Sequence, residues 1–203
     1  MTLLALLRHG ETEWSREGRI QGRTDVPLSD AGRKSLAGRS LPVDCRGMRV
    51  VTSPLLRCVE TATLLGLTQV EHEARIAEMY WGSWEGHRLE DLRAVLGESM
   101  RDNEARGFDF TPPGGESPRR VLDRVSGWLA DVAADGRSTL AIAHRGVIRV
   151  IFAAAARWDL QGRPPLKLDW GAVHFFRLDR TGAPSLFRMN LPMAENSGDA
   201  TGK

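Results

Sequence analysis

Two short apolar runs, far apart in the chain, each lead directly into a histidine. Residues 3–7 (LLALL) precede a basic pair that contains His9, and residues 139–143 (TLAIA) precede a basic pair that contains His144. A short apolar run that ends at a turn residue is typical of a buried strand. In open α/β sheets, ligands bind beyond the carboxyl ends of the strands. We therefore expect both histidines, with an arginine each, at the same edge of one sheet.

Helical periodicity and capping signals occur between these two runs and after the second one. The expected helices span residues 29–37, 54–67, 88–106, 117–134 and 147–156. The other expected strands are residues 49–52, residues 69–71 and a hairpin of residues 173–178 and 185–189. Ser53-Pro54 and Ser117-Pro118 each place a capping residue before a proline at the first helical position. Strands that alternate with helices predict a three-layer α/β/α sandwich with a mostly parallel mixed sheet.

The length of 203 residues suits one domain with a well-developed core. We assign residues 1–192 to this single domain, with a short helical cap at about residues 86–113 that ends in a run of prolines and glycines. The small, polar residues 193–203 are expected to form a disordered tail.

Composition and charge favour an ordinary soluble protein. Hydrophobic residues make up 41% and charged residues 27% of the chain, and the formal net charge is +2. Arginines are spread along the chain without a basic block, so we expect a local basic pocket and no nucleic-acid partner. The run at residues 3–7 is too short for a signal-peptide core or a membrane span, so we expect a cytoplasmic protein without a membrane partner. Cys45 and Cys58 are expected to be reduced structural thiols, since two cysteines match neither a disulfide framework nor a metal site.

The basic residues around the two histidines suit a phosphate. A guanidinium can meet phosphate oxygens through two parallel hydrogen bonds. Arg8 adjoins His9, and Arg57 lies one turn into the helix expected from Ser53-Pro54. Free N–H groups and the helix dipole favour an anion at such a helix start. We therefore expect both arginines and both histidines to converge on one phosphoryl group.

Phosphoryl transfer would require different states of the two imidazoles. One must be neutral at the nitrogen that attacks phosphorus, and the other can be cationic and hold the phosphoryl oxygens. The leaving alkoxide needs a proton, which calls for a carboxylic acid whose pKa is raised by burial. Glu78 lies in a segment rich in aromatic residues and glycine, but spacing alone does not separate it from Glu85.

An ordered series of motifs resembles the histidine phosphatase superfamily, the phosphoglycerate mutase-like proteins. The similarity begins at residues 8–14 (RHGETEW) and ends at residues 144–149 (HRGVIR). The matches between them are residues 18–22 (GRIQG), 25–29 (DVPLS), Gly32, 53–57 (SPLLR), 60–62 (ETA), Glu78, 82–86 (GSWEG) and 114–117 (GGES). Each motif alone is weak, but their shared order from Arg8 to Arg149 leaves little room for chance.

The resemblance implies a role for each matching residue. His9 would be the nucleophile that becomes phosphohistidine, and Glu78 rather than Glu85 would be the proton donor. The residues implied for the phosphate pocket are Arg8, Arg57 and His144. The positions implied to contact phosphate or substrate are Gln21, Gly22, Trp81 and the backbone at Arg145.

Two positions depart from the family's usual pattern. Members usually carry Asn where this chain has Ser15, whose hydroxyl could still donate to a substrate phosphate but with a shorter reach. Many members carry Gly where this chain has Arg145. The added guanidinium would either favour an anionic substrate group at the pocket rim or only contact surface carboxylates.

The superfamily divides according to the fate of the phosphohistidine. A phosphatase admits water, whereas a mutase excludes water and returns the phosphoryl group to its substrate. Resembling mutases carry a longer insert with an adjacent arginine pair before the GGES motif. In this chain residues 86–113 are short, and Arg119-Arg120 follows that motif. We therefore expect a metal-independent phosphomonoesterase without a cofactor, acting on a small-molecule phosphate ester such as a sugar phosphate or α-ribazole phosphate.

Alternatives remain open at the level of activity and of single residues. The chain could be a 2,3-bisphosphoglycerate-dependent phosphoglycerate mutase, or a weakly catalytic protein that binds a phosphorylated ligand. Arg93, Arg101 and Arg106 would form a solvated helix face, or would line a capping helix over the pocket. Three further histidines lack a comparable motif and are expected to be structural or surface residues: His72, His87 and His174.

Overall fold

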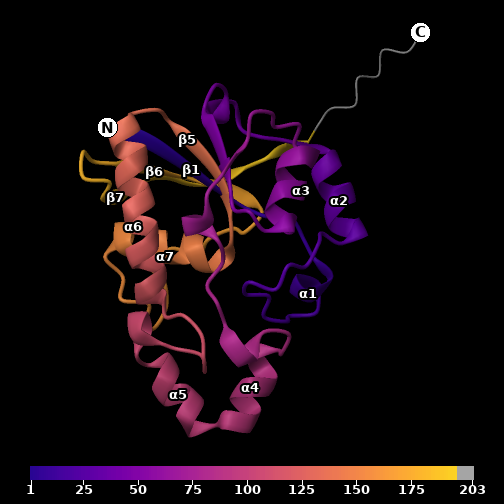
Figure 1. Cartoon of the computed structure of the whole chain (residues 1–203), viewed down its shortest axis with the longest axis vertical. Helices are drawn as coiled ribbons and strands as arrows, with labels where there is room; N and C mark the ends of the chain where they lie inside the picture. Colours follow the sequence, from indigo (N-terminus) through magenta and orange to yellow (C-terminus); the bar gives the residue numbers. More distant parts are fainter. Residues whose placement is uncertain (196–203) are drawn as a thin grey trace.

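The computed structural model describes residues 1–195, and its centre is a six-stranded mixed sheet (Figure 1). The strand order is β4-β3-β5-β1-β6-β7. The strands are β1 (Thr2–Arg8), β3 (Arg49–Thr52), β4 (Glu71–His72), β5 (Thr139–Ala143), β6 (Ala172–Leu178) and β7 (Pro184–Pro192). Neighbours among β4, β3, β5 and β1 pair in parallel, whereas β6 is antiparallel to both β1 and β7. The mostly parallel mixed sheet predicted from the sequence is therefore confirmed.

Helices cover both faces of this sheet. α2 and α3 lie on one face, α6 and α7 lie on the other, and α4 and α5 extend from one end (Figure 1). The helices are α1 (Glu13–Arg16), α2 (Asp30–Ala37), α3 (Leu56–Leu64), α4 (Leu89–Leu96), α5 (Glu98–Glu104), α6 (Pro118–Asp135) and α7 (Arg145–Ala156). Short 3₁₀ turns are η1 (Val43–Cys45), η2 (Ala74–Ile76), η3 (Gly82–Trp84) and η4 (Gly107–Asp109). The predicted three-layer architecture is thus present.

Side chains of β1 alternate between two hydrophobic cores. Leu4 and Leu6 pack beneath α6 and α7, whereas Ala5 and Leu7 pack beneath α3. Both cysteines, which are free and buried as predicted, belong to this second core. Because both faces of a parallel sheet are covered, its strands are apolar throughout rather than alternating. The same burial fixes the position of the strand end that leads into His9.

Two helices are capped as the sequence predicts. Ser29 Oγ accepts a hydrogen bond from the Gly32 N–H at 3.0 Å at the start of α2. Ser117 Oγ accepts one from the Arg120 N–H at 3.3 Å at the start of α6. Each bond satisfies an N–H group that the first helical turn leaves without a partner.

The predicted start of α3 at Ser53-Pro54 is wrong by two residues. α3 begins at Leu56, whose N–H donates to Asp25 Oδ1 at 2.7 Å. Ser53 Oγ instead lies 2.7 Å from His144 Nε2. A carboxylate from a distant loop therefore binds the first helical N–H, whereas the Ser53 hydroxyl contacts the histidine and accepts from the Leu55 N–H at 3.4 Å. Arg57 still lies within the first turn of the helix.

The helix predicted over residues 88–106 is interrupted at Gly97. This residue has a φ of +52° and separates α4 from α5. A left-handed residue cannot continue a right-handed helix, and glycine adopts that conformation without a side-chain clash. Both helices lie within residues 86–113, the segment that we expect to act as a cap.

The folded chain extends past the predicted tail boundary at residue 193. Ala194 and Glu195 form β8, which pairs antiparallel with β2 (Arg39–Ser40). These residues therefore belong to the folded domain. The remainder of the predicted tail, residues 196–203, lies outside the described residues.

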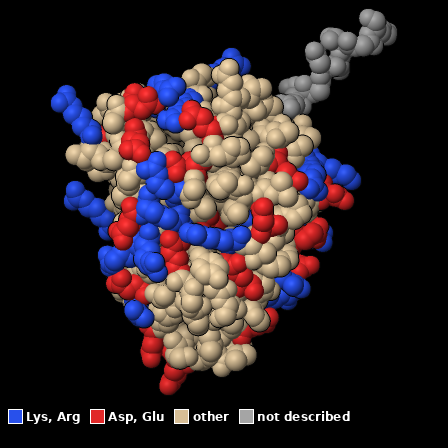
Figure 2. Space-filling view, in the orientation of Figure 1, with Lys and Arg blue, Asp and Glu red and all other residues tan. Residues whose placement is uncertain are grey.

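Charged side chains of both signs share the molecular surface. On the face in Figure 2, Lys and Arg side chains are interspersed with Asp and Glu, and no broad surface of one sign covers this face. This distribution agrees with the expectation of a local basic pocket. Within residues 1–195, every helix is too short or too polar to cross a membrane.

Gly136, the residue that follows α6, requires a left-handed backbone. Its φ is +75°, and no neighbouring atom lies within 4 Å of a Cβ placed there. Gly38, which follows α2, has equally open space but a φ of −94°. We expect Gly136→Ala to lower the free energy of unfolding by about 1 kcal/mol, and the matched Gly38→Ala to leave it unchanged or slightly raised. Urea unfolding measures both variants, and equal losses would contradict a backbone origin of the effect.

Candidate active site

The pairing of β1 with β5 brings the two predicted histidines together. The strands are parallel, with Arg8 opposite Ala143. The His9 N–H donates to the Ala143 carbonyl at 3.0 Å, which continues the pairing one residue beyond β1. The ring centroids of His9 and His144 lie 5.3 Å apart. The juxtaposition expected from the two apolar runs is therefore present.

His9 has a defined tautomer. Its Nδ1 lies 2.7 Å from the Gly10 carbonyl oxygen, which can only accept, so Nδ1 carries the proton. Burial, followed by the charges of Arg8 and Arg57, holds the pKa of His9 well below its ordinary value. The imidazole is therefore neutral at pH 7, and its unprotonated Nε2 is the candidate nucleophile.

His144 lies beside His9 and is fully buried. Its Nε2 lies 2.7 Å from Ser53 Oγ and 3.5 Å from Cys58 Sγ. Burial, followed by the charge of Arg57, lowers the pKa of His144 well below its ordinary value. Burial and the nearby charges thus favour a neutral imidazole in the protein without a bound anion. A phosphoryl dianion near the ring would shift its pKa in the opposite direction.

Within residues 1–195, Arg8 and Arg57 each carry an N–H group without a hydrogen-bond partner. Arg57 is fully buried, and its terminal nitrogens donate to the carbonyls of Thr24 at 2.9 Å and Gly22 at 2.7 Å. The Nε atom of each arginine is buried and has no hydrogen-bond partner among the described residues. Burial also lowers the pKa of both side chains. Since an unpaired buried N–H is costly, a bound anion would stabilise both arginines.

Glu78 contributes a buried carboxyl group to the same site. Its Oε1 accepts from the Met79 N–H at 2.8 Å, and its Oε2 accepts from the Gly146 N–H at 3.1 Å. Burial raises the pKa of Glu78, although these two N–H groups oppose the shift. A Cβ at position 146 would lie 2.3 Å from Glu78 Oε1, so only glycine allows this approach. Glu78 therefore has the properties of a proton donor.

Glu85 has a structural position that distinguishes it from Glu78. Its Oε1 accepts from the N–H groups of Arg23 at 2.8 Å and Trp81 at 3.1 Å. Its Oε2 accepts from the Thr24 N–H at 3.0 Å and from the Thr24 hydroxyl at 2.6 Å. These donors occupy both oxygens and join two loops. The arrangement favours Glu78 over Glu85 as the proton donor, in line with the resemblance.

An ion pair braces the backbone at Glu78. Arg124 donates to Glu116 through Nε at 2.8 Å and Nη2 at 3.0 Å, and its Nη2 also donates to the Glu78 carbonyl at 3.2 Å. Arg23 Nε donates to the same carbonyl at 3.4 Å. The bracing role of this ion pair was not predicted from the sequence, although Glu116 belongs to the matched GGES motif. Arg124, the ion-pair partner on α6, explains why a carboxylate occupies position 116.

A cavity of about 310 Å³, termed the histidine cavity, collects the predicted site residues. Its lining contains all of them except His144: Arg8, His9, Ser15, Gln21, Gly22, Arg57, Glu78, Trp81 and Arg145. The chain separation between these residues is large, so the fold and not local sequence brings them together. Their individual roles in binding and catalysis stay predictions.

Ser15 and Gln21 are both tied to Thr12. The Ser15 hydroxyl donates to the Thr12 carbonyl at 2.9 Å within the capping box of α1. Its proton is therefore already engaged, which weakens the prediction that it donates to a substrate phosphate. The Thr12 hydroxyl donates to Gln21 Oε1 at 2.9 Å, which leaves the Gln21 amide nitrogen as a donor at the cavity.

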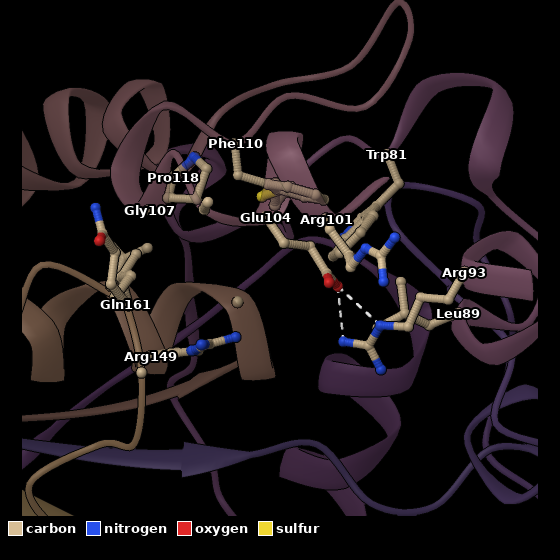
Figure 3. Close-up of a pocket in the computed structure, with 16 residues that line it drawn as sticks. Trp81, Leu89, Arg93, Arg101, Glu104, Gly107, Phe110, Pro118, Arg149 and Gln161 are labelled. Carbon is tan, nitrogen blue, oxygen red and sulfur yellow. Dashed lines mark hydrogen bonds and ion pairs between the residues drawn. The ribbon is translucent and has the colours of Figure 1, made fainter. Parts of the chain in front are cut away.

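A second cavity of about 550 Å³, termed the cap cavity, adjoins the first. The two cavities share Trp81, Leu89, Gly146 and Arg149. Side chains from the cap and from α7 surround this space in Figure 3. The shared lining makes the cap cavity a continuation of the histidine cavity toward α4 and α5.

The cap arginines do not behave alike. Arg93 and Arg101 line the cap cavity, as one of the two open alternatives requires, whereas Arg106 does not. Arg93 donates to Glu104 Oε1 through Nε at 2.9 Å and Nη2 at 2.7 Å (Figure 3). Arg149, from α7, lines both cavities, and sequence analysis assigned it no role. The HRGVIR motif contains it and was the available signal.

Arg145 lies at the rim of the histidine cavity. Its guanidinium stacks over the Trp170 ring, 5.1 Å from the centroid. Among residues 1–195 it has no carboxylate partner. Of the two expectations for this residue, a position at the pocket rim fits, and pairing with surface carboxylates does not.

The three remaining histidines lie outside these cavities. His72 and His87 are exposed. His174 is buried on β6, and its Nδ1 accepts from the Asn190 N–H at 3.2 Å. In the part of the chain that the structure describes, no three His, Cys, Asp or Glu side chains cluster as metal ligands.

Comparisons with known proteins agree on one family. The family model "Histidine phosphatase superfamily (branch 1)" matches residues 4–191. An acid phosphatase of Mycobacterium tuberculosis is 37% identical over 154 residues, which cover 73% of this chain and 68% of the relative. A 2,3-bisphosphoglycerate-dependent phosphoglycerate mutase of Azorhizobium caulinodans is 30% identical over 190 residues, which cover 87% of this chain and 92% of the relative. A solved structure of a mycobacterial glucosyl-3-phosphoglycerate phosphatase aligns with a TM-score of 0.76 over 94% of this chain and 100% of its own, at 23% identity, and supports the fold alone.

The buried histidines make stability depend on pH. The folded pKa of His144 is lowered, so below pH ~6.5 the unfolded chain binds a proton that the folded chain does not. We expect the free energy of unfolding to fall as pH falls through this range, by up to about 1.4 kcal/mol per pH unit for each such histidine. His144→Asn should reduce this slope, and His87→Asn should not, because the His87 side chain is exposed. Urea unfolding at pH 7.5 and 5.5 (about one unit either side of the ordinary value) measures the difference. Equal slopes for wild type and His144→Asn would contradict it.

Proposed function

The chain belongs to the histidine phosphatase superfamily, and on this basis we propose that it is a metal-independent phosphomonoesterase that forms a phosphohistidine at His9. Its substrate is a small phosphorylated metabolite. One observation carries the proposal: a neutral His9 Nε2, two arginine N–H groups without protein partners and a buried Glu78 meet in one cavity. The acid phosphatase relative, at 37% identity, supports the phosphatase branch.

In the first step, His9 Nε2 attacks phosphorus. The N–P bond forms as the bond between phosphorus and the ester oxygen breaks, and the proton of Glu78 passes to that oxygen. Arg8 and Arg57 hold the non-bridging oxygens of the phosphoryl group through their free N–H groups. Phosphoryl transfer depends mainly on positioning and charge stabilisation, which fixed guanidinium groups supply.

In the second step, water attacks the phosphohistidine. The new O–P bond forms as the N–P bond breaks, and the ionised Glu78 accepts the proton of the water. Inorganic phosphate leaves, and His9 and Glu78 return to their starting protonation states. Glu78 thus acts as acid and then as base, and a pKa raised by burial suits both tasks near neutral pH.

The mutase alternative has its own support in the Azorhizobium caulinodans relative, at 30% identity. The cap of this chain argues against it. α4 and α5 carry no adjacent arginine pair. Arg119 lies on α6, where it donates to Asp109 through Nε at 2.6 Å and Nη2 at 2.9 Å. We therefore favour hydrolysis of the phosphohistidine over its return to a bound sugar acid.

Phosphate release with a chelator present tests the proposed function. We expect wild type to hydrolyse p-nitrophenyl phosphate, a sugar phosphate or α-ribazole phosphate, and to trap an acid-labile phosphohistidine on rapid quenching. His9→Ala should abolish both signals, since it removes the nucleophile, whereas the exposed His87→Ala should keep them. Conversion of 3-phosphoglycerate only with 2,3-bisphosphoglycerate present would establish the mutase instead. Binding of phosphate esters without phosphohistidine would establish a binding protein.

The leaving group decides how much Glu78 matters in the first step. Glu78→Gln removes the acid, so we expect kcat/KM for an alkyl phosphate to fall about 100-fold or more. The value for p-nitrophenyl phosphate should fall much less, because p-nitrophenolate leaves without a proton. Wild-type kcat/KM for the alkyl ester should decline as pH rises through the raised pKa of Glu78, and the variant should lose this decline. Equal losses for both esters would exclude Glu78 as the acid, and Glu90→Gln on the exposed face of α4 serves as the control.

A further inference from the structure

The histidine cavity contains more positive charge than a phosphoryl group needs. Its lining includes four arginines for which residues 1–195 provide no ion pair: Arg8, Arg57, Arg145 and Arg149. A fifth lining arginine, Arg19, is paired with Glu17 at 2.8 Å. Glu78 is the one carboxyl group in the described lining. A phosphate monoester carries at most two negative charges, so two of these guanidinium groups remain without an ion-pair partner among residues 1–195.

The two surplus charges lie one turn apart on α7. Arg145 and Arg149 are spaced i, i+4, which places two like charges on the same side of a helix at a cost in stability. Each guanidinium is oriented by an aromatic ring: Arg145 over Trp170 at 5.1 Å, and Arg149 over Trp158 at 5.2 Å. The pair is therefore held in place without a carboxylate, which is the arrangement expected of an anion-binding group.

Arg149 also faces the cap cavity. Figure 3 shows its side chain extending from α7 into the space between Gln161 and the cap. The other cap-cavity arginines have acidic partners: Glu104 accepts two hydrogen bonds from Arg93, and Glu98 lies 3.5 Å from Arg101. Arg149 forms no ion pair among residues 1–195, and Glu104, the carboxylate that opposes the lowering of its pKa by burial, is hydrogen-bonded to Arg93.

The position of Glu78 indicates a route for the leaving group. A proton donor must face the ester oxygen, and the N–H that holds Glu78 Oε2 belongs to Gly146, which lines both cavities. A leaving group that faces Glu78 can therefore extend past Gly146 into the cap cavity. There it would meet Trp81 and Phe110, whose rings contact edge to face with centroids 5.5 Å apart.

Building on the proposed function, we propose that the leaving group of the substrate carries a second anionic group, a carboxylate or a phosphate, which binds Arg149. The body of the leaving group packs against Trp81 and Phe110. Arg145 adds to the positive potential without a direct contact to this group. Arg149 is accordingly a residue that determines substrate specificity, and it takes no part in the transfer of the phosphoryl group.

Matched aryl phosphates test this inference. The substrates are 4-carboxyphenyl phosphate, its neutral isostere 4-carbamoylphenyl phosphate, and 1,4-phenylene bisphosphate. We expect wild type to prefer an anionic substrate over the neutral one in kcat/KM, mainly through KM. Arg149→Met should reduce this preference about tenfold, which corresponds to about 1.4 kcal/mol, and Arg149→Lys should restore part of it. Arg180→Met, in the exposed turn between β6 and β7, removes the same charge elsewhere and should leave the preference intact.

Each outcome has a definite meaning. Preference for the carboxylate or for the bisphosphate identifies the chemistry of the second group, provided that Arg149→Met removes it. Hydrolysis of all three substrates without preference, or a preference that survives Arg149→Met, overturns the inference and leaves the proposed function standing. If the protein hydrolyses none of the three substrates and also fails to hydrolyse p-nitrophenyl phosphate, the proposed function and the inference are both overturned.

Discussion

The hydrogen bond from the His9 N–H to the Ala143 carbonyl is the contact on which the site depends. It continues the parallel pairing of β1 and β5 into the two loops that carry the histidines. Parallel strands end at the same edge of a sheet. Residues about 135 positions apart in the chain are therefore placed side by side by the strand pairing itself. Gly146, at the start of α7, then anchors Glu78, and Arg57 enters from α3. The remaining groups are positioned relative to these two strand ends.

Burial gives these groups chemical properties that they lack in water. The same low-polarity surroundings hold His9 neutral, raise the pKa of Glu78 and leave arginine N–H groups without acceptors. All three effects oppose folding, because each places a polar group where its solvation is poor. The Glu116–Arg124 pair holds the backbone beneath Glu78 in place. The site therefore contains poorly solvated polar groups, which a bound anion would stabilise.

Sequence patterns predicted the features that depend on neighbouring residues. The caps at Ser29 and Ser117 and the strands on either side of the histidines needed only short-range information. The start of α3 failed because its cap comes from Asp25, about 30 residues away, while Ser53 serves His144. Spacing could not separate Glu78 from Glu85, because the difference lies in which loop donates to each carboxylate. The position of Arg149 was not predicted for a similar reason, because only the two adjoining cavities show what its guanidinium faces.

The cap and the phosphate site are built from separate parts of the chain. α4, α5 and η4 come from one continuous stretch. The residues proposed to bind the phosphoryl group come from strand ends and from α3 and α7. The cap is thus a module that recombination between relatives could exchange as one segment. Such a graft would change the shape that the cavity accepts, while Arg149 would stay with the recipient scaffold. With Arg149 in the role proposed above, shape selectivity and charge selectivity would be encoded in separate parts of the chain, and either could change without the other.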